Sequence, residues 1–326
     1  MNSLQKLQSH FNAKIDAHSF VRYPENLYEP IDYIMGIGGK RLRPVAVFMA
    51  CDAFGGDIKE AEAAALAIEI FHNFTLVHDD IMDEAPLRRG QQTVHEKYNL
   101  STAILSGDMM LIDSYEKLMH YAEHPHFSLL LSTFNTAARQ VCEGQQLDMD
   151  FEQRDQVSIE EYLKMIQWKT AVLFAAALKI GALLGGATPL QAQGLYEYGL
   201  GVGLAFQVQD DILDSFGDPV KFGKKVGGDI IQGKKTILVL KTLENLNTAD
   251  KERFLNTLNN YQLEEIDKVE SIKSYFKAGG ALEFAEGLKE DYRMKGIESL
   301  QKKTDLPEFQ QTPFIELAEY LLGRKE

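Results

Sequence analysis

The sequence predicts an all-α fold built from long helices, on three observations. Apolar residues recur at every third or fourth position over long stretches, as they do on one face of a helix. Proline is scarce, with 9 residues in 326, or about half of its usual share in globular proteins. Runs of alternating apolar and polar residues bounded by Asn-Gly or Asp-Gly, which are typical of β-hairpins, are missing. We therefore expect helices and no hairpin.

The helical pattern can be followed element by element. In residues 60–84, spacings of three or four residues place six side chains on one face: Ala64, Ile68, Phe71, Thr75, Asp79 and Asp83. Similar patterns predict helices at 101–122, 127–147, 159–184, 190–215, 231–246 and 308–323. Glycine or proline residues interrupt the chain at 36–39, 123–125, 185–189 and 217–228. Because no Ser/Gly-rich linker and no change of composition separates these helices, we expect a single domain over residues 1–326.

Charge and composition exclude several classes of protein. The chain has 34 Lys and Arg against 48 Asp and Glu residues, a net charge of −14, whereas a nucleic-acid-binding protein needs a basic face. The most apolar stretch, 171–186, is interrupted by Lys179 and is shorter than the about 20 residues that span a bilayer. This indicates a buried helix and no stable membrane insertion. Two cysteines make no disulfide framework and the N-terminus is polar, so we expect a cytoplasmic protein.

An acidic motif occurs twice in the chain. DDIMD contains Asp79, Asp80 and Asp83, and DDILD contains Asp210, Asp211 and Asp214. On a helix the first and fifth positions lie one turn apart on one face, with about 6 Å between their Cβ atoms. Carboxylates at that spacing repel one another, and a divalent cation such as Mg²⁺ bridging their oxygens would relieve the repulsion. A solvated acidic face is the alternative, but two copies of the motif make it less plausible.

Basic side chains gather near glycines and near the acidic motifs. They are Lys40, Arg41, Arg43, Arg88, Arg89, Lys169, Lys224 and Lys234. Arginine can bind phosphate through two parallel hydrogen bonds, and an unpaired ammonium in an apolar helix, as at Lys169, would be costly. Each of these residues taken singly is more often a surface cation. Acids and bases interleaved in this way nevertheless indicate a phosphorylated substrate with bridging metals.

Six segments carry a resemblance to a known family. They are GGKRLRP at 38–44, LVHDDIMDEAPLRRG at 76–90, GD at 107–108, KT at 169–170, FQVQDDILD at 206–214 and GKKVGGDIIQGKKT at 223–236. The sequence resembles the trans-prenyltransferases, the isoprenyl diphosphate synthase (polyprenyl synthetase) family. That resemblance implies a bundle of about ten or more helices around a deep central cavity, usually as a homodimer. It also implies condensation of isopentenyl diphosphate with an allylic diphosphate, head to tail.

The resemblance also implies roles for individual residues. Asp79, Asp83 and Asp210 would hold about three Mg²⁺ ions on the allylic diphosphate, with Asp80, Asp211 and Asp214 as further or supporting ligands. The same diphosphate would be bound by Arg88, Lys169 and Lys224. The diphosphate of isopentenyl diphosphate would be bound by Gly39, Lys40, Arg43, His72 and Arg89, and Lys234 is a further substrate-binding candidate. Thr170 and Gln207 would direct oxygens at the developing allylic cation. One departure is Gly228, before Asp229, where the family often has Lys.

Product length in this family depends on residues below the first acidic motif. On a helix, Thr75 lies one turn below Asp79, and Phe71 lies about 12 Å below it. Phe74 occupies the position that the family uses as a floor in short-chain enzymes, while Thr75 leaves more room than an aromatic residue. We therefore expect a C20 product, with C15 close behind, and less readily a chain of C30 or more. Ordinary core packing of both phenylalanines is the alternative.

Other functions predict different motifs. A class I terpene cyclase would share the fold and the first motif, but its second metal motif is of an Asn/Ser/Glu type. A head-to-head synthase has differently spaced acidic motifs and lacks GGKRLRP. The non-catalytic subunit of a heteromeric synthase would have lost one or both metal motifs, and here both are complete. A short-chain trans-prenyl diphosphate synthase is therefore the preferred hypothesis.

Overall fold

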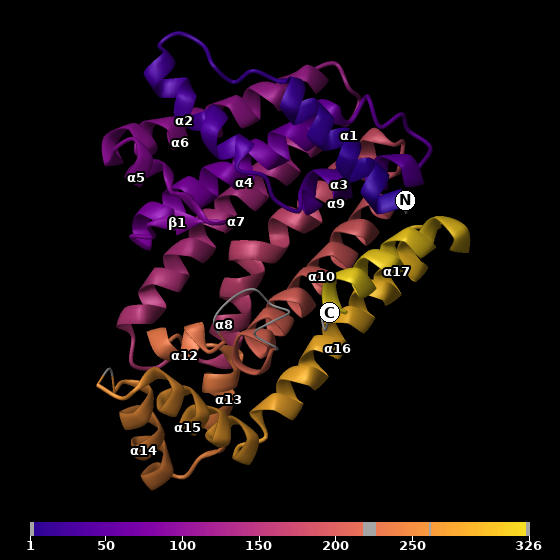
Figure 1. Ribbon diagram of the computed structural model, residues 1–326. Helices are drawn as coiled ribbons and strands as arrows, with labels where there is room; N and C mark the ends of the chain where they lie inside the picture. Colours follow the sequence, from indigo (N-terminus) through magenta and orange to yellow (C-terminus); the bar gives the residue numbers. More distant parts are fainter. Residues whose placement is uncertain (1–2, 218–225, 261, 324–326) are drawn as a thin grey trace. The chain divides into compact units, whose positions relative to one another are not determined.

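A computed structural model describes residues 3–217, 226–260 and 262–323 (Figure 1). Helices account for most of them and number more than ten, so the all-α prediction is confirmed. In unbroken order they are α1 (Ser3–Ala17), α2 (Glu25–Gly36), α3 (Leu42–Ala53), α4 (Glu62–Met82), α5 (Val94–Lys97), α6 (Leu100–Leu118), the 3₁₀ turn η1 (Met119–Tyr121), α7 (Phe127–Gln153), α8 (Ile159–Ile166), the π-helical turn η2 (Gln167–Ala171), α9 (Val172–Leu184) and α10 (Pro189–Phe216). After residues 218–225 come α12 (Gly228–Gln232), α13 (Ile237–Asn245), α14 (Thr248–Leu258), α15 (Glu265–Ala278), α16 (Ala281–Lys303) and α17 (Glu308–Leu322).

Several helices begin where the sequence supplies a capping side chain. The Asn99 side chain accepts a hydrogen bond of 2.8 Å from the Thr102 amide at the start of α6. At the start of α8, Ser158 and Glu161 form a reciprocal capping box. Such caps satisfy amide groups that have no partner within the helix. They explain why these helices begin close to the predicted residues.

One short hairpin contradicts the expectation that hairpins are absent. Strands β1 (Leu87–Arg88) and β2 (Gln91–Gln92) pair antiparallel. The two turn residues, Arg89 and Gly90, have φ angles of +53° and +76°, and two-residue hairpin turns of this kind need positive φ at both positions. Because Arg-Gly replaces the usual Asn-Gly or Asp-Gly, the sequence pattern did not reveal this turn.

The C-terminal third is more helical than the sequence predicted. The expected helix at 231–246 is wrong at its start, because Gly233 ends α12 at a φ of +71° and α13 begins only at Ile237. Helices α14, α15 and α16 occupy a region for which no helix was predicted. Their sequences are more polar than those of the predicted helices, so they offer fewer of the apolar residues on which the prediction depended.

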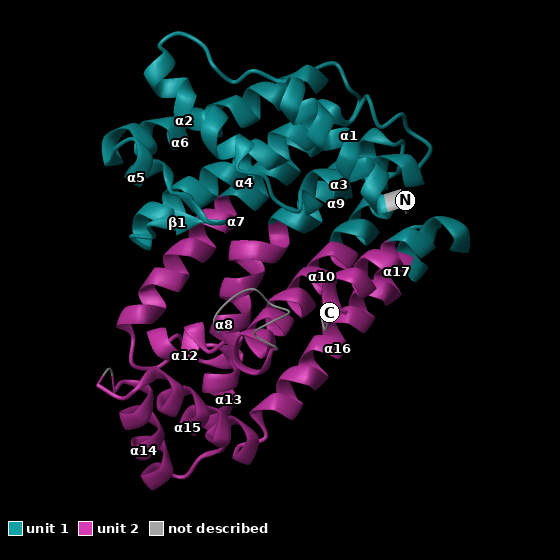
Figure 2. Ribbon diagram, in the orientation of Figure 1, with its two compact units in different colours: residues 1–138, 173–196, 301–313 teal, residues 139–172, 197–300, 314–326 magenta. Residues whose placement is uncertain are grey.

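The described chain divides into two compact units (Figure 2). Unit 1 contains residues 1–138, 173–196 and 301–313, and unit 2 contains 139–172, 197–300 and 314–326. The boundaries at 138/139 and 196/197 fall inside α7 and α10, so each of these helices contributes to both units. The single domain and its deep central cavity stay predictions.

Each unit has its own apolar core. In unit 1, α4 packs chiefly against α6 and α3, and fully buried side chains include Phe48, Ile68 and Phe71. In unit 2, one cluster joins Tyr162 and Val208 to residues of the C-terminal helices such as Phe254 and Phe276. The helices that carry the acidic motifs, α4 and α10, both contribute to these cores. Their positions within each unit are therefore fixed by packing.

Among the residues that the structure describes, one apolar helical stretch, Ile159–Leu184, is long enough to cross a membrane. Of its most apolar window, 72% is buried inside the protein. A core helix of a folded protein passes the same test of length and composition, and burial favours that explanation. The absence of stable membrane insertion and the cytoplasmic location stay predictions.

Candidate active site

The first acidic motif lies at the C-terminal end of α4, in unit 1. Asp79 and Asp80 belong to its last turn, and Asp83 is the residue that follows the helix. The carbonyl end of a helix bears partial negative charge, so three carboxylates there are unfavourable without cations. Asp79 is partly exposed, Asp83 is exposed, and Asp80 is buried. The motif therefore presents two of its three carboxylates toward the surface of unit 1.

Arg88 holds the buried carboxylate of this motif. Its Nε lies 2.9 and 2.8 Å from the two carboxylate oxygens of Asp80, and its Nη2 lies 2.7 Å from Asp80 Oδ1. The same Nη2 is 3.9 Å from Asp79 Oδ2. Charged hydrogen bonds of this kind fix the plane of a guanidinium group. Asp80 thus orients Arg88 beside Asp79.

The hairpin between β1 and β2 brings Arg89 to the glycine-rich loop. Arg89 Nη1 donates to the Gly38 carbonyl. A Cβ atom on Gly39 would lie 2.6 Å from Arg89 Nη1, and Gly39 has a φ of +140°. The positive φ favours glycine at this position, and the absence of a Cβ atom leaves room for the Arg89 guanidinium. The loop before α3 and the hairpin after α4 are therefore brought together through Gly38, Gly39 and Arg89.

An arginine in the first turn of α3 contacts α4. Arg43 Nη1 lies 3.1 Å from His72 Nε2. Because a guanidinium can only donate, the His72 nitrogen accepts and its ring proton is on Nδ1. Burial, followed by the positive charge of Arg43 and other arginines, lowers the pKa of His72 well below its usual value. A neutral His72 is thus the form that holds Arg43.

The remaining residues predicted for isopentenyl diphosphate lie in the same region. Lys40 is exposed in the loop between Gly39 and α3. Burial lowers the pKa of Arg43, and burial with the charge of Arg41 lowers that of Arg89. A bound anion would oppose that destabilisation of positive charge. Four of the five predicted residues, Gly39, Arg43, His72 and Arg89, are linked pairwise by contacts across the loop, α4 and the hairpin.

The second acidic motif lies near the C-terminal end of α10, in unit 2. Asp211 is buried and accepts a hydrogen bond of 2.5 Å from the Tyr162 hydroxyl and one of 3.1 Å from the Ile237 amide. Burial raises the pKa of Asp211 to about 7. Asp210 and Asp214 are half-buried, and Asp214 Oδ2 accepts from the Asp229 amide at 3.0 Å. Asp211 therefore joins α10 to α8 and α13, in the way that Asp80 joins α4 to the hairpin.

Lys169 is paired, although the sequence did not reveal its partner. Its Nζ lies 2.6 Å from Asp148 Oδ2 on α7, and its side chain is 27% exposed. Lys169 and Thr170 belong to the π-helical turn η2, a kind of irregularity often found at functional sites. A Cβ atom on Gly144 would lie 2.3 Å from the Lys169 amide nitrogen. Gly144 therefore lets α7 approach η2 closely, and Asp148, one turn further along α7, meets the ammonium group.

The other predicted residues are placed as follows. Gln207 is half-buried on α10, Thr170 is half-buried in η2, and Lys234 is exposed, with its amide 2.9 Å from the Asp229 carbonyl oxygen. Lys224 lies outside the described residues. Gly228, the departure from the family pattern, is the first residue of α12.

The residues predicted to limit product length form an aromatic cluster in unit 1. The ring centroids of Phe71 and Phe74 are 5.4 Å apart, and Phe134 of α7 lies 5.3 Å from Phe71. Phe74 also contacts His78, at 4.9 Å. Thr75 is half-buried, and its hydroxyl donates to the His72 carbonyl at 2.7 Å. The sequence indicated Phe71 and Phe74, but Phe134 could be found only from the structure.

Magnesium fits the donor chemistry of the two motifs. Among the residues that the structure describes, no three His, Cys, Asp or Glu side chains converge on one point. Mg²⁺ does not need such a cage, because one or two carboxylates, waters and substrate phosphates complete its octahedron. Asp79, Asp83, Asp210 and Asp214 are accessible oxygen donors of this kind. They are the residues that could hold the metal, within their own units.

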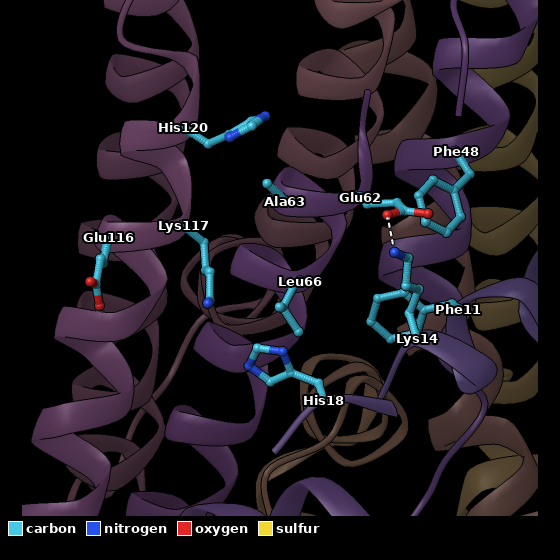
Figure 3. Close-up of a pocket in the computed structure, with 10 residues that line it drawn as sticks. All are labelled: Phe11, Lys14, His18, Phe48, Glu62, Ala63, Leu66, Glu116, Lys117 and His120. Carbon is cyan, nitrogen blue, oxygen red and sulfur yellow. Dashed lines mark ion pairs between the residues drawn. The ribbon is translucent and has the colours of Figure 1, made fainter. Parts of the chain in front are cut away.

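A pocket elsewhere in unit 1 is separate from these motifs (Figure 3). Its volume is about 450 Å³, and it lies between α1, α3, α4, α6 and η1. Phe11 and Phe48 form an apolar wall, beside an ion pair of 2.6 Å between Lys14 and Glu62. Its lining residues include none of the predicted metal or diphosphate ligands. The pocket is therefore not the predicted diphosphate site.

Comparison with known proteins identifies the family. The polyprenyl synthetase family model matches residues 24–276. The geranylgeranyl diphosphate synthase of Methanosarcina mazei is 37% identical over 326 residues, covering 100% of this chain and 98% of that protein. The geranylgeranyl diphosphate synthase of Sulfolobus acidocaldarius is 39% identical over 306 residues, covering 92% and 91%. A crystal structure of a geranylgeranyl pyrophosphate synthase is similar with a TM-score of 0.91 and 41% identity, over 100% of both chains. The chain with these two acidic motifs and its paired arginines belongs to the polyprenyl synthetase family.

Proposed function

We propose that this protein is a prenyltransferase that condenses isopentenyl diphosphate head to tail with an allylic diphosphate, giving a C20 product. The observation that carries the proposal is the position of the two acidic motifs at the C-terminal ends of α4 and α10. Both the helix dipole and the neighbouring carboxylates disfavour negative charge there, so the motifs require cations. Similarity to geranylgeranyl diphosphate synthases supports the C20 product.

Asp79, Asp83 and Asp210 would hold about three Mg²⁺ ions, with Asp214 as a further ligand. When bound, the metal would stabilise the negative charge of the departing diphosphate. Asp80 and Asp211 support the ligands instead, because their carboxylates are buried on Arg88 and Tyr162. This division of roles agrees with the exposure of each carboxylate.

Two of the cations proposed to bind the allylic diphosphate are each held by a carboxylate. Arg88 is held by Asp80, and Lys169 is held by Asp148. Donors fixed before the reaction stabilise developing charge without reorganising. As the allylic C–O bond ionises, these groups would meet the leaving diphosphate. Lys224, which lies outside the described residues, is the third residue proposed for this role.

The isopentenyl diphosphate would bind to the group formed by Gly39, Lys40, Arg43, His72 and Arg89. Neutral His72 accepts from Arg43 Nη1 and adds no positive charge of its own, so the guanidinium keeps its charge for a phosphate oxygen. Holding the isopentenyl double bond in place converts a bimolecular step into a local one.

Thr170 and Gln207 would direct oxygens toward the allylic cation, and Lys234 is a further candidate for substrate binding. The cation needs an apolar site that excludes water, because water would quench it. The apolar residues around η2, such as Ile166 and Ala171, are buried in unit 2. They support such an environment next to Thr170.

The direct test supplies dimethylallyl, geranyl or farnesyl diphosphate with labelled isopentenyl diphosphate and Mg²⁺. We expect geranylgeranyl diphosphate as the main product by mass spectrometry. If farnesyl diphosphate is the only product, the proposed product length is C15 and not C20. Chains of C30 or more would indicate a long-chain synthase. A cyclic hydrocarbon formed without isopentenyl diphosphate would favour a terpene cyclase. Absence of any elongated product would contradict the proposal.

Removal of divalent cations should strongly weaken binding of the allylic substrate. The net charge is −14, and six of the 48 acidic residues belong to the two motifs. Without metal those carboxylates repel a diphosphate. In EDTA we expect the affinity for a non-reactive thiodiphosphate analogue, measured by calorimetry, to fall by about a hundredfold or more. Equal affinity with and without Mg²⁺ would contradict the metal-bridged site.

We also propose that the protein is a homodimer that pairs through α6 and the η1 turn that follows it. Leu105, Ile112 and Met119, seven residues apart, are 57%, 58% and 54% exposed. Large apolar side chains at this spacing form a stripe suited to a partner helix. The wild-type protein should sediment as a dimer and an Ile112→Glu variant as a monomer. A monomeric wild-type protein would exclude this interface.

A further inference from the structure

Arg41 stands between two residues proposed to bind diphosphate, but its own side chain is buried. It is 5% exposed, and its Nη1 lies 2.5 Å from Glu69 Oε1 on α4. Its Nη2 donates to the Met35 carbonyl at 2.6 Å. The guanidinium therefore turns away from solvent, into the core of unit 1. It cannot act as a surface donor to a phosphate without leaving these partners.

The acceptor of this ion pair is itself fixed. Glu69 is 3% exposed, and Asn73, one turn further along α4, is 1% exposed. Asn73 Nδ2 donates to the Glu69 carbonyl at 2.8 Å and lies 3.3 Å from Glu69 Oε1. These two contacts fix the Asn73 amide nitrogen against Glu69, while Asn73 Oδ1 is buried without a hydrogen-bond partner. Glu69 and Asn73 are therefore a rigid attachment point on α4.

Arg41 and the two glycines before it have positive φ angles, and a contact with α4 would hold the backbone in this conformation. Gly38 and Gly39 have φ angles of +89° and +140°, and Arg41 itself has a φ of +48°. A non-glycine residue in the left-handed region persists only where its surroundings hold it. The same short loop places Gly38 against Arg89 and starts the helix from which Arg43 reaches His72. A shift at Arg41 would move both contacts.

We propose that Arg41, Glu69 and Asn73 are positioning residues. They hold the loop before α3, which carries Gly39 and Lys40, in a fixed position on α4. They act through Gly39, Lys40 and Arg43 and do not touch the substrate. Because α4 also carries Asp79, the attachment sets the position of one diphosphate site relative to the first metal motif. The inference rests on the proposed function. It predicts that variants of these residues bind isopentenyl diphosphate less well and bind the allylic substrate as before.

The test compares steady-state kinetics of Arg41→Met and Glu69→Gln with those of the wild-type protein. We expect KM for isopentenyl diphosphate to rise about tenfold or more, with KM for the allylic substrate changed less than twofold. The double variant should be no worse than the more impaired single variant, since both changes break one contact. An Arg41→Lys variant, which keeps the charge but loses the fork, should give an intermediate KM.

Arg22→Met is the control for the loss of an arginine beside a buried carboxylate, at a position where the arginine itself is 40% exposed. Arg22 Nη1 lies 3.6 Å from Asp113 Oδ1, and Asp113 is 2% exposed. Like Arg41→Met, this change leaves a buried carboxylate of unit 1 without its arginine. It should lower the melting temperature and leave both KM values within twofold.

The outcomes separate positioning from simple stability. If Arg41→Met and Glu69→Gln lower the melting temperature as Arg22→Met does, without a selective rise in KM for isopentenyl diphosphate, the positioning role is wrong. Equal rises in both KM values would also contradict it. Where Arg41→Met does not fold, Glu69→Gln and Arg41→Lys decide the question. Failure of the proposed function would appear differently, as the absence of condensation by the wild-type protein.

Discussion

An Asp79→Ala variant is expected to lose roughly a thousandfold or more in kcat/KM for condensation, because metal-bound charge stabilises the transition state by several kcal/mol. Asp79 is a partly exposed carboxylate at the end of α4, beside the guanidinium that Asp80 orients. Its removal takes away a proposed metal ligand and leaves the contact between Arg88 and Asp80 in place. The measurement is initial rate with labelled isopentenyl diphosphate at saturating Mg²⁺.

The control for this experiment is Asp16→Ala, at an exposed acidic residue of α1. Both variants change the net charge by one unit. A difference in activity between them therefore reports the role of Asp79 in binding metal and not the change of charge. We expect the control to keep the wild-type rate within twofold and both proteins to have similar melting temperatures. Full activity of Asp79→Ala would show that the first motif does not hold the catalytic metal.

A Phe74→Ala variant is expected to make longer products than the wild-type protein. Phe74 is 7% exposed and packs against Phe71 and His78. Removing the ring opens space beside the helix that carries Asp79. The growing prenyl chain can then extend past position 74 before another side chain blocks it. Mass spectrometry of the dephosphorylated products should show chains beyond C20. The change should also cost about 3–5 kcal/mol of stability, as do other Phe→Ala changes in cores.

Phe48→Ala controls for that loss of packing. Phe48 is fully buried on α3 and contacts Phe11, at 6.1 Å between ring centroids. Its replacement should destabilise unit 1 by a similar amount and leave the product length unchanged. If both variants make the wild-type product, Phe74 is ordinary core packing and the limit on chain length lies elsewhere.

The local structure of the acidic motifs could be predicted because it depends on residues close in sequence. Periodicity alone predicts a helix that carries Asp79, which α4 confirms. Asp83, predicted one turn further on, is the residue that follows α4, and its amide donates to the Asp79 carbonyl at 2.9 Å. The same reasoning placed the second motif on α10. It failed for the hairpin around Arg89, whose turn residues are unusual, and for α14–α16, whose sequences are polar and contain few apolar residues. The resemblance, and not periodicity, supplied the individual substrate roles.

Partners that are distant in sequence could not be predicted. Lys169 was expected to need a counter-charge, but nothing in the sequence indicated Asp148, 21 residues away. Tyr162 is 49 residues from Asp211, and Glu69 is 28 residues from Arg41. Each of these contacts depends on how two helices, or a helix and a loop, pack within one unit. Side-chain patterns do not encode that packing in any local form.

By itself, the sequence determined the helical class, the two pairs of carboxylates at one-turn spacing and the family to which they belong. Those features follow from helix periodicity and from the order of short motifs. Only the tertiary structure decided which members of each motif face outward. Asp80 and Asp211 are buried on Arg88 and Tyr162, whereas Asp79 and Asp210 remain partly exposed. The physical reason is burial: a carboxylate removed from water needs hydrogen-bond donors, and only the folded chain brings them to it.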